Sequence, residues 1–197
     1  FQFRKSSNEP YWTHPIQVWS MMCRTLRSCG GSWHDETIEC AALLHDVVED
    51  TDWTLNQIQG VFGEEIAQIV GELTNDNSLP QAEKKAKMIE KALHISDQAR
   101  IIKCFDRIHN LSDMVGNFKD KFVWKYAKES ILLARNLDKG NDPAVMGLEW
   151  HIEATDAVEL LQISIDNLTD FCYNKQGIKE FERLLDQDKV TADTQME

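Results

Sequence analysis

The run from Ala41 to Thr51, Ala-Ala-Leu-Leu-His-Asp-Val-Val-Glu-Asp-Thr, places histidine and acidic side chains at helical spacing within an apolar stretch. One inward stripe passes from apolar to polar residues: Ile38, Ala41, Ala42, His45, Val48 and Glu49. His45 and Glu49 are four residues apart, as are Asp46 and Asp50, so each pair is predicted to share one helix face. Such groups are costly to bury unless they bind an ion or hydrogen-bond one another. The run therefore predicts metal-assisted hydrolysis.

A second His-Asp pair, His34-Asp35, follows Gly30-Gly31-Ser32 and has a simpler explanation. We predict that Asp35 caps the next helix, with Glu36 near the positive helix terminus, which requires no chemistry. A comparable alternative applies to His45-Asp46. Taken alone, that pair is more often a hydrogen-bonded core histidine beside an exposed acid, so the metal hypothesis depends on further residues.

A second helical segment, Ile101–Leu111, also turns from apolar to polar along one face. The members of this stripe are Ile102, Asp106 and Asn110. Asp106 is therefore a candidate oxygen ligand that arrives from another helix. The alternative for Asp106 is a buried salt bridge to Arg107 or Lys103.

His14 lies in the third informative segment, Tyr11-Trp12-Thr13-His14-Pro15. Pro15 suits the first position of a helix, which would put His14 at the N-terminal end of that helix. Taken alone, His14 would be a cap or a surface residue. The complete candidate set contains two imidazoles and two carboxylates: His14, His45, Asp46 and Asp106. This set suits a borderline divalent ion such as Mn, Fe, Co or Zn, because the carboxylates offset the charge of the metal.

The order His, then His-Asp, then Asp resembles the HD superfamily of metal phosphohydrolases. Within it, several segments resemble the hydrolase domain of the RelA/SpoT family, above all its small alarmone hydrolases of metazoan type. These segments are Ala41–Thr51, Phe62-Gly63, Leu73-Thr74-Asn75-Asp76, Leu79-Pro80, Glu83-Lys84-Lys85 and Lys103–Leu111. The resemblance extends from about residue 4 to about residue 136 and is specific because the motifs occur in the order of the family.

The resemblance implies a role for each matching residue. It implies that one Mn²⁺ ion is held by His14, His45, Asp46 and Asp106, while Glu49 and Asp50 position or activate the attacking water. It also implies substrate contacts from five residues: Arg4 and Lys5 at the guanine base, Asn110 near the sugar or phosphate, and Lys84 and Lys85 at the phosphates.

The sequence also departs from the pattern of this family. The interval between His14 and His45 is longer, Gln81 follows Leu79-Pro80 where relatives carry lysine, and Ser112 stands where arginine is common. A tyrosine that faces the substrate in relatives has no unambiguous match here, because Trp124 and Tyr126 flank its expected place. These departures concern nucleotide recognition and leave the predicted metal site complete.

Composition favours an intracellular enzyme. The chain of 197 residues is 42% hydrophobic, enough for one domain with a sizeable core. Its five cysteines are odd in number and lack CxxC spacing, which favours a reducing cytoplasm. We expect neither a signal peptide nor a membrane span, although the chain lacks an initiator Met. The formal net charge of −12 disfavours nonspecific nucleic-acid binding.

The coarse organisation is all-α. Thr54-Leu55-Asn56-Gln57 has the form of a capping box, and Gly63 is predicted to end the helix that follows it. Ile66, Ile69, Val70 and Leu73 then form the apolar stripe of the next helix. The other predicted helices are Pro15–Leu26, Glu36–Asp50, Gln81–Leu93, Asp97–Val115, Asp120–Leu137, Leu148–Asp170 and Gly177–Leu185. Residues 1–185 are expected to form one HD-type domain with C-terminal packing helices, and residues 186–197 a flexible acidic tail.

The predicted function is Mn-dependent hydrolysis of ppGpp-type alarmones at the 3′ position, giving GDP or GTP and pyrophosphate. No synthetase segment is visible, so we expect degradation only. Two alternatives stay open. The same metal site could act on adenine alarmones or on the 2′-phosphate of NADPH, or the pocket could serve a non-catalytic nucleotide sensor or partner-binding module. The small-molecule nucleotide is the only partner that the sequence indicates, and the oligomeric state is left open.

Overall fold

Helices dominate the protein, which we describe from a computed structural model of residues 2–5, 7–28, 35–114, 117–139 and 157–167. The helices are α1 (Thr13–Ser28), α2 (Glu36–Leu44), α3 (Val47–Asp50), α4 (Leu55–Phe62), α5 (Glu64–Leu73), α6 (Gln81–Lys91), α7 (Asp97–Ser112) and α8 (Asp120–Lys139), and residues 157–167 are also helical. The β structure of the described residues is one isolated bridge between Phe3 and Pro10. The predicted all-α fold is confirmed.

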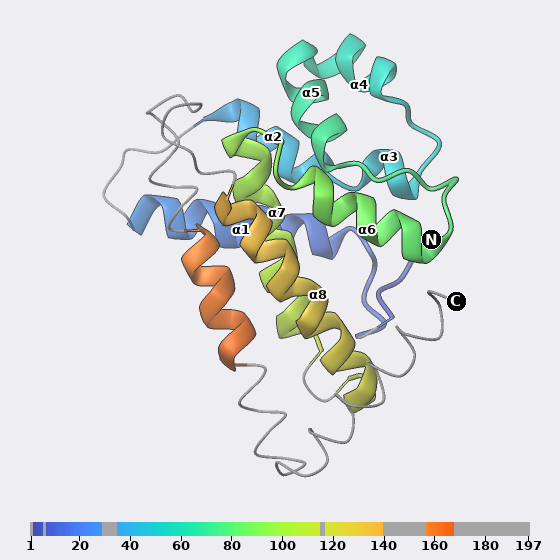
Figure 1. Cartoon of the computed structure of the whole chain (residues 1–197). Coiled ribbons are helices and arrows are strands. Elements are labelled where there is room, and N and C mark those ends of the chain that lie inside the picture. Colours follow the sequence, from blue (N-terminus) through green and yellow to red (C-terminus); the bar gives the residue numbers. More distant parts are fainter. Residues whose placement is uncertain (1, 6, 29–34, 115–116, 140–156, 168–197) are drawn as a thin grey trace.

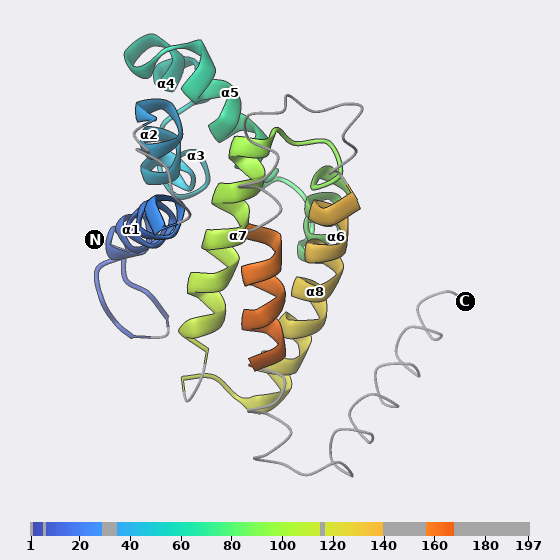
Figure 2. The ribbon, with the colours of Figure 1, turned by 90° about the vertical axis from the view of Figure 1, so that its left-hand side faces the viewer.

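Helix α7 is central to the arrangement (Figure 1). In Figure 2, α1, α2 and α3 lie on one side of α7, α6 and α8 lie on the other, and α4 and α5 sit at one end. Contacts of α7 with α1, α2, α5 and α8 agree with this view. Because α7 touches both groups, side chains from its different faces meet residues that are far apart in the sequence.

Local hydrogen bonds set several helix ends as predicted. Asp35 accepts hydrogen bonds from the backbone N–H groups of Thr37 and Ile38, and so caps α2. Thr54 forms the complete capping box with Gln57 at the start of α4. Gly63 separates α4 from α5 with a φ of 97°, a conformation that side chains other than glycine rarely adopt.

The predicted helix Glu36–Asp50 is wrong as a single element, because it breaks at His45 and Asp46. Asp46 has φ −101° and ψ −4°, which lies in the sparsely allowed bridge region. The side-chain Nδ1 of His45 lies 2.8 Å from the carbonyl oxygen of Ala42. His45 therefore follows α2 while Glu49 lies on α3, so the two residues are not on one continuous helix. Asp46 and Asp50 stay in one turn, because the Asp50 N–H donates to the Asp46 carbonyl at 3.0 Å.

Other helix boundaries differ from the predictions by a few residues. Helix α1 begins at Thr13, so His14 lies inside its first turn and Pro15 is its third residue. Helix α6 ends at Lys91 and α7 ends at Ser112. Backbone hydrogen bonds shift at helix ends, whereas the apolar stripes determine which face is buried. The predicted helix Gly177–Leu185, the ends of Leu148–Asp170, and the tail at 186–197 lie outside the described residues.

The buried face of each helix follows its apolar stripe. Ile38, Ala41 and Ala42 on α2 are fully buried, and Ile102 on α7 is as well. On α5, Ile69, Val70 and Leu73 are buried, while Ile66 is half-buried. Residues 157–167 pack on this core through Val158, Leu161 and Ile165. Burial of these side chains provides the main stabilisation of the fold and holds the polar groups of α1, α2 and α7 together.

The N-terminal segment folds back along the protein towards α3 and α7. The Arg4 N–H donates to the Glu9 carbonyl and the Tyr11 N–H donates to the Gln2 carbonyl, each at 2.8 Å. The Gln2 side chain also donates to the Asp50 carbonyl at 2.6 Å. These bonds attach residues 2–5 and 7–11 to α3 and bring Arg4 towards Asn110 of α7.

No helix in the described part of the chain combines the length and the apolar character needed to cross a membrane. The cytoplasmic location inferred from the cysteines stays a prediction.

Candidate metal site and its surroundings

Three of the four predicted metal ligands form one buried group. His14 on α1, His45 after α2 and Asp106 on α7 each offer a ligand atom, and these atoms lie within 4.8 Å of one another. All three side chains are buried, with 1%, 2% and 6% exposure. Asp46 completes the set, because its Oδ2 lies 3.2 Å from His45 Nε2 and 3.6 Å from His14 Nε2. The four residues predicted from sequence are therefore brought together.

The hydrogen bonding of His45 fits a metal ion at this position. A carbonyl oxygen can only accept, so the contact with Ala42 places the proton of neutral His45 on Nδ1. The lone pair of His45 Nε2 is then on the side of the Asp46 and Asp106 carboxylates. This Nε2 is buried and has no hydrogen-bond partner among the described residues. A cation between Nε2 and the carboxylates would accept this unused lone pair. Imidazole nitrogens and carboxylate oxygens are both suitable ligands for such an ion.

The electrostatics of the group also favour a cation. Burial by itself lowers the pKa of His45, but the adjacent carboxylates of Asp46 and Asp106 raise it to about 9. Burial opposes ionisation of Asp106, yet Lys103 and the two histidines hold its pKa well below the usual range. The interior therefore keeps negative charge beside imidazole nitrogens, an arrangement suited to a divalent ion.

Asp106 lies beside the other candidate ligands and also forms the predicted ion pair with Lys103. Its Oδ1 faces His14 Nε2 at 3.2 Å and accepts a hydrogen bond from Asn110 Nδ2 at 2.6 Å. Its Oδ2 accepts from Lys103 Nζ at 3.0 Å, so the predicted alternative of a salt bridge is also present. Arg107 instead lies over the ring of Tyr126, with 4.4 Å between the guanidinium carbon and the ring centroid.

The Glu49 carboxylate bonds to residues outside the candidate metal site. Its Oε1 accepts hydrogen bonds from the backbone and side-chain nitrogens of Asn75 at 2.8 and 2.9 Å. Its Oε2 lies 3.3 Å from Lys84 Nζ. Lys84 also contacts the side-chain oxygen of Asn77. Glu49 thus links α3 to the loop after α5 and to α6.

Asp50 lines a pocket that opens beside the metal group. The pocket has a volume of about 300 Å³ and contains Asp46 and Asp50 together with apolar side chains, among them Trp12 and Leu43. Burial, followed by the nearby Asp46 carboxylate, raises the pKa of Asp50. The pocket therefore joins two acids of the predicted site to solvent along an apolar wall.

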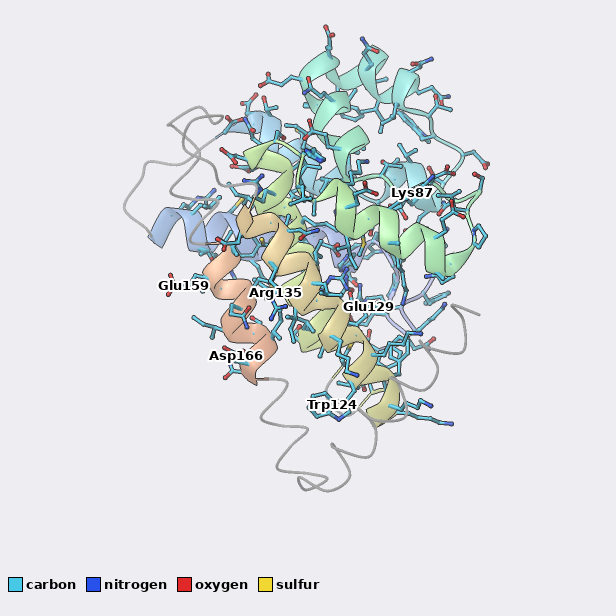
Figure 3. All side chains as sticks on the ribbon, viewed as in Figure 1. Lys87, Trp124, Glu129, Arg135, Glu159 and Asp166 are labelled. Atoms are coloured by element: carbon cyan, nitrogen blue, oxygen red, sulfur yellow. The ribbon has the colours of Figure 1, made fainter. Side chains whose placement is uncertain are left out.

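The predicted substrate-binding residues occupy different surroundings. Arg4 is 9% exposed, and its guanidinium donates to Asp113 Oδ2 at 2.7 Å and to Asn110 Oδ1 at 3.0 Å. Lys5 is exposed. Lys85 Nζ lies 2.6 Å from Oε1 of Glu129, which is labelled on α8 in Figure 3. Arg4 and Asn110 thus form one network with Asp106, whereas Lys84 and Lys85 are each held by a carboxylate.

Three residues at the site were not singled out from the sequence. The Tyr11 hydroxyl donates to Asp46 Oδ2 at 2.7 Å, and burial with this carboxylate raises the pKa of Tyr11. His109 Nδ1 lies 2.8 Å from His14 Nδ1, and burial lowers the pKa of His109 to about 4. Asn75 binds Glu49. His109 carried one available signal, since it follows Asp106 by three residues and so shares its helix face.

Comparison with known proteins agrees with this geometry. Residues 2–133 match the family described as HD domain. The chain belongs to the HD-domain family. Hydrolases with this domain bind divalent metals, and His14, His45 and Asp106 form the candidate metal site of this HD domain. The resemblance predicted from the sequence is confirmed.

Several relatives of this HD-domain chain carry the name guanosine-3′,5′-bis(diphosphate) 3′-pyrophosphohydrolase MESH1. The proteins from Danio rerio and Homo sapiens are 45% and 41% identical over 105 residues, which cover 53% of this chain and 56% of each relative. A probable guanosine-3′,5′-bis(diphosphate) 3′-pyrophosphohydrolase from Synechocystis is 30% identical over 189 residues, which cover 91% of this chain and 23% of the relative. The chain thus matches just over half the length of the two MESH1 proteins.

Two solved structures are similar to the HD-domain chain along most of its length. One is described as a metazoan ortholog of SpoT that hydrolyses ppGpp and plays a role in starvation responses. It has a TM-score of 0.66 and 28% identity, with 90% of this chain and 88% of that chain covered. The other, a protein from Listeria monocytogenes, has a TM-score of 0.55 and 27% identity, with 79% and 99% covered.

Proposed function

We propose that this protein is a Mn-dependent hydrolase of ppGpp-type alarmones that cleaves at the 3′ position and releases GDP or GTP and pyrophosphate. The observation that carries the proposal is the convergence of His14, His45, Asp46 and Asp106 in an HD domain. Similarity to proteins named for ppGpp 3′-pyrophosphohydrolysis supports the choice of substrate.

The metal would be held by His14 and His45 through Nε2 and by the carboxylates of Asp46 and Asp106. When bound, the metal would supply Lewis acidity and would lower the pKa of a coordinated water towards about 7, as in the best-known zinc case. Tyr11 orients the Asp46 carboxylate through its hydroxyl. Lys103 and Asn110 fix the two oxygens of Asp106. These outer contacts hold the ligands before the ion arrives.

Glu49 and Asp50 would position the attacking water and accept its proton. Both oxygens of Glu49 are occupied, by Asn75 and by Lys84, which favours a positioning role for this residue. Asp50 lines the open pocket beside Asp46 and is the better placed proton acceptor. Water then forms a bond to the phosphorus attached to the 3′ oxygen, and the bond between that oxygen and phosphorus breaks. The 3′ oxygen leaves with a proton as a hydroxyl.

Substrate binding is assigned to the cations near the site. Lys84 lies next to Glu49, and Lys85 lies across from Glu129, so phosphate oxygens would compete with these carboxylates for the two ammonium groups. Arg4 donates to Asn110 and Asp113, and we assign its guanidinium to the purine ring. Lys5 is next to it. We infer that base recognition depends on this end of the site.

The product distinguishes this proposal from the two alternative functions. Metal-loaded protein is incubated with ppGpp, pppGpp, the adenine counterparts and NADPH, and every product is identified by mass. We expect GDP and pyrophosphate from ppGpp, with loss of activity in chelator and recovery with Mn²⁺. Asp50→Asn should reduce turnover at least 100-fold, as expected for loss of a proton acceptor. The exposed neighbour variant Asp52→Asn is the matched control.

Release of orthophosphate from NADPH without turnover of ppGpp would refute ppGpp as the substrate. It would leave the proposed metal site unchanged. Full turnover by chelated protein would overturn the metal mechanism. Tight nucleotide binding without any product would favour the sensor.

A further inference from the structure

A hydrogen bond joins two histidines beside the candidate metal site. His109 lies on α7, three residues after Asp106, and its Nδ1 is 2.8 Å from Nδ1 of His14. The ring centroids are 4.9 Å apart, with 46° between the ring planes. His14 is 1% exposed, so water does not replace this partner. One of the two Nδ1 atoms must donate the proton and the other must accept it.

The metal site fixes the direction of this hydrogen bond. His14 turns its other nitrogen, Nε2, toward Asp106 at 3.2 Å and Asp46 at 3.6 Å. A ring nitrogen binds a metal through its lone pair, so Nε2 cannot carry the proton in the loaded site. The proton of neutral His14 must then be on Nδ1, which donates to Nδ1 of His109. His45 is arranged in the same way, with its Nδ1 on the Ala42 carbonyl.

We propose that His109 is a positioning residue, which holds His14 in the orientation and tautomer that bind the metal. The proposal rests on the metal site put forward under the proposed function. His109 acts through His14, because its Nδ1 is already used in the hydrogen bond between the two rings. A metal-ligating histidine usually donates its second ring N–H to a carboxylate, a backbone carbonyl or a water molecule. Loss of that acceptor typically costs 10–100-fold in metal affinity. Here the partner is a second imidazole.

Isosteric variants separate this role from simple space filling. His109→Leu removes the acceptor and puts an apolar side chain of similar size in its place. His109→Asn keeps an acceptor, because Oδ1 of asparagine occupies the place of Nδ1. We expect His109→Leu to weaken Mn²⁺ binding about 10–100-fold and His109→Asn to recover most of it. Affinity is measured by titration calorimetry of chelator-stripped protein, with stoichiometry from native mass spectrometry.

His94→Leu is the matched control, because His94 is exposed on the turn between α6 and α7. Thermal unfolding of the metal-free proteins checks the fold, and His109→Phe replaces His109→Leu if the latter does not fold. Wild-type Mn²⁺ affinity in His109→Leu, or an equal loss in His109→Leu and His109→Asn, would overturn the positioning role alone. Absence of Mn²⁺, Fe²⁺, Co²⁺ and Zn²⁺ binding by the wild-type protein would overturn the metal site and the role of His109 with it.

Discussion

Replacement of Glu49 by alanine separates metal binding from catalysis. The Glu49 carboxylate is bound by Asn75 and Lys84 and is not a member of the group that contains His14, His45 and Asp106. Glu49→Ala should therefore keep one metal ion per chain. Turnover should fall about 100-fold or more, as for an attacking water that has lost its positioning residue, which corresponds to about 2.7 kcal/mol of transition-state stabilisation.

The same variant should lower stability by a calculable amount. The side chains of Lys84 and Glu49 are 22% and 16% exposed, so water screens their ion pair and it contributes at most about 1 kcal/mol. The two Asn75 hydrogen bonds are only partly buried and contribute about 0.5–1.5 kcal/mol each, so together with the ion pair they amount to about 1–4 kcal/mol. Since each kcal/mol lowers Tm by about 2–4 °C in a domain of this size, Glu49→Ala should unfold about 2–16 °C below the wild type.

The assay combines three measurements on one preparation. Metal content is determined by mass spectrometry of the purified protein, kcat and KM by product release from ppGpp, and Tm by calorimetry. Lys84→Met breaks the ion pair while the Asn75 bonds remain, and Lys87→Met, on the same helix but 58% exposed, is its control. A loss of metal in Glu49→Ala that parallels the loss of turnover would refute the reasoning, because Glu49 would then be a ligand.

Three further variants test other parts of the structure. Asp46→Ala removes a ligand carboxylate, so the purified protein should contain little metal even though it folds; wild-type metal content by mass spectrometry would contradict this. Arg4→Ala should raise KM for ppGpp about tenfold with unchanged metal content, since a guanidinium contact to base or phosphate contributes about 1–3 kcal/mol; unchanged KM in the Arg4→Ala, Lys5→Ala double variant would remove both residues from the site. Gly63→Ala should destabilise the protein by about 1 kcal/mol in urea unfolding, because φ is +97° there and a side chain is strained in that conformation; an unchanged midpoint would show that the turn relaxes.

The sequence by itself determined the helical architecture and the chemistry of the metal site. Helix ends at Asp35, Thr54 and Gly63 depend on hydrogen bonds or φ angles within a few residues, so local sequence carries that information. The apolar stripes around Ile38 and Ile102 select the buried faces. Because these stripes end in His45 and Asp106, the same pattern that forms the core also places two candidate ligands in it.

The tertiary structure decided how the polar groups are paired. The helix break at His45-Asp46 accompanies a hydrogen bond from Tyr11, 35 residues away, which local propensity does not report. The contact between His14 and His109 spans 95 residues, and that between Arg4 and Asp113 spans 109. Each of these side chains has several possible partners in the sequence, and only the packing of α1, α3 and α7 places one of them within hydrogen-bonding distance. Spacing along a helix predicts which residues share a face, whereas the partner of each residue across helices is set by burial of the core.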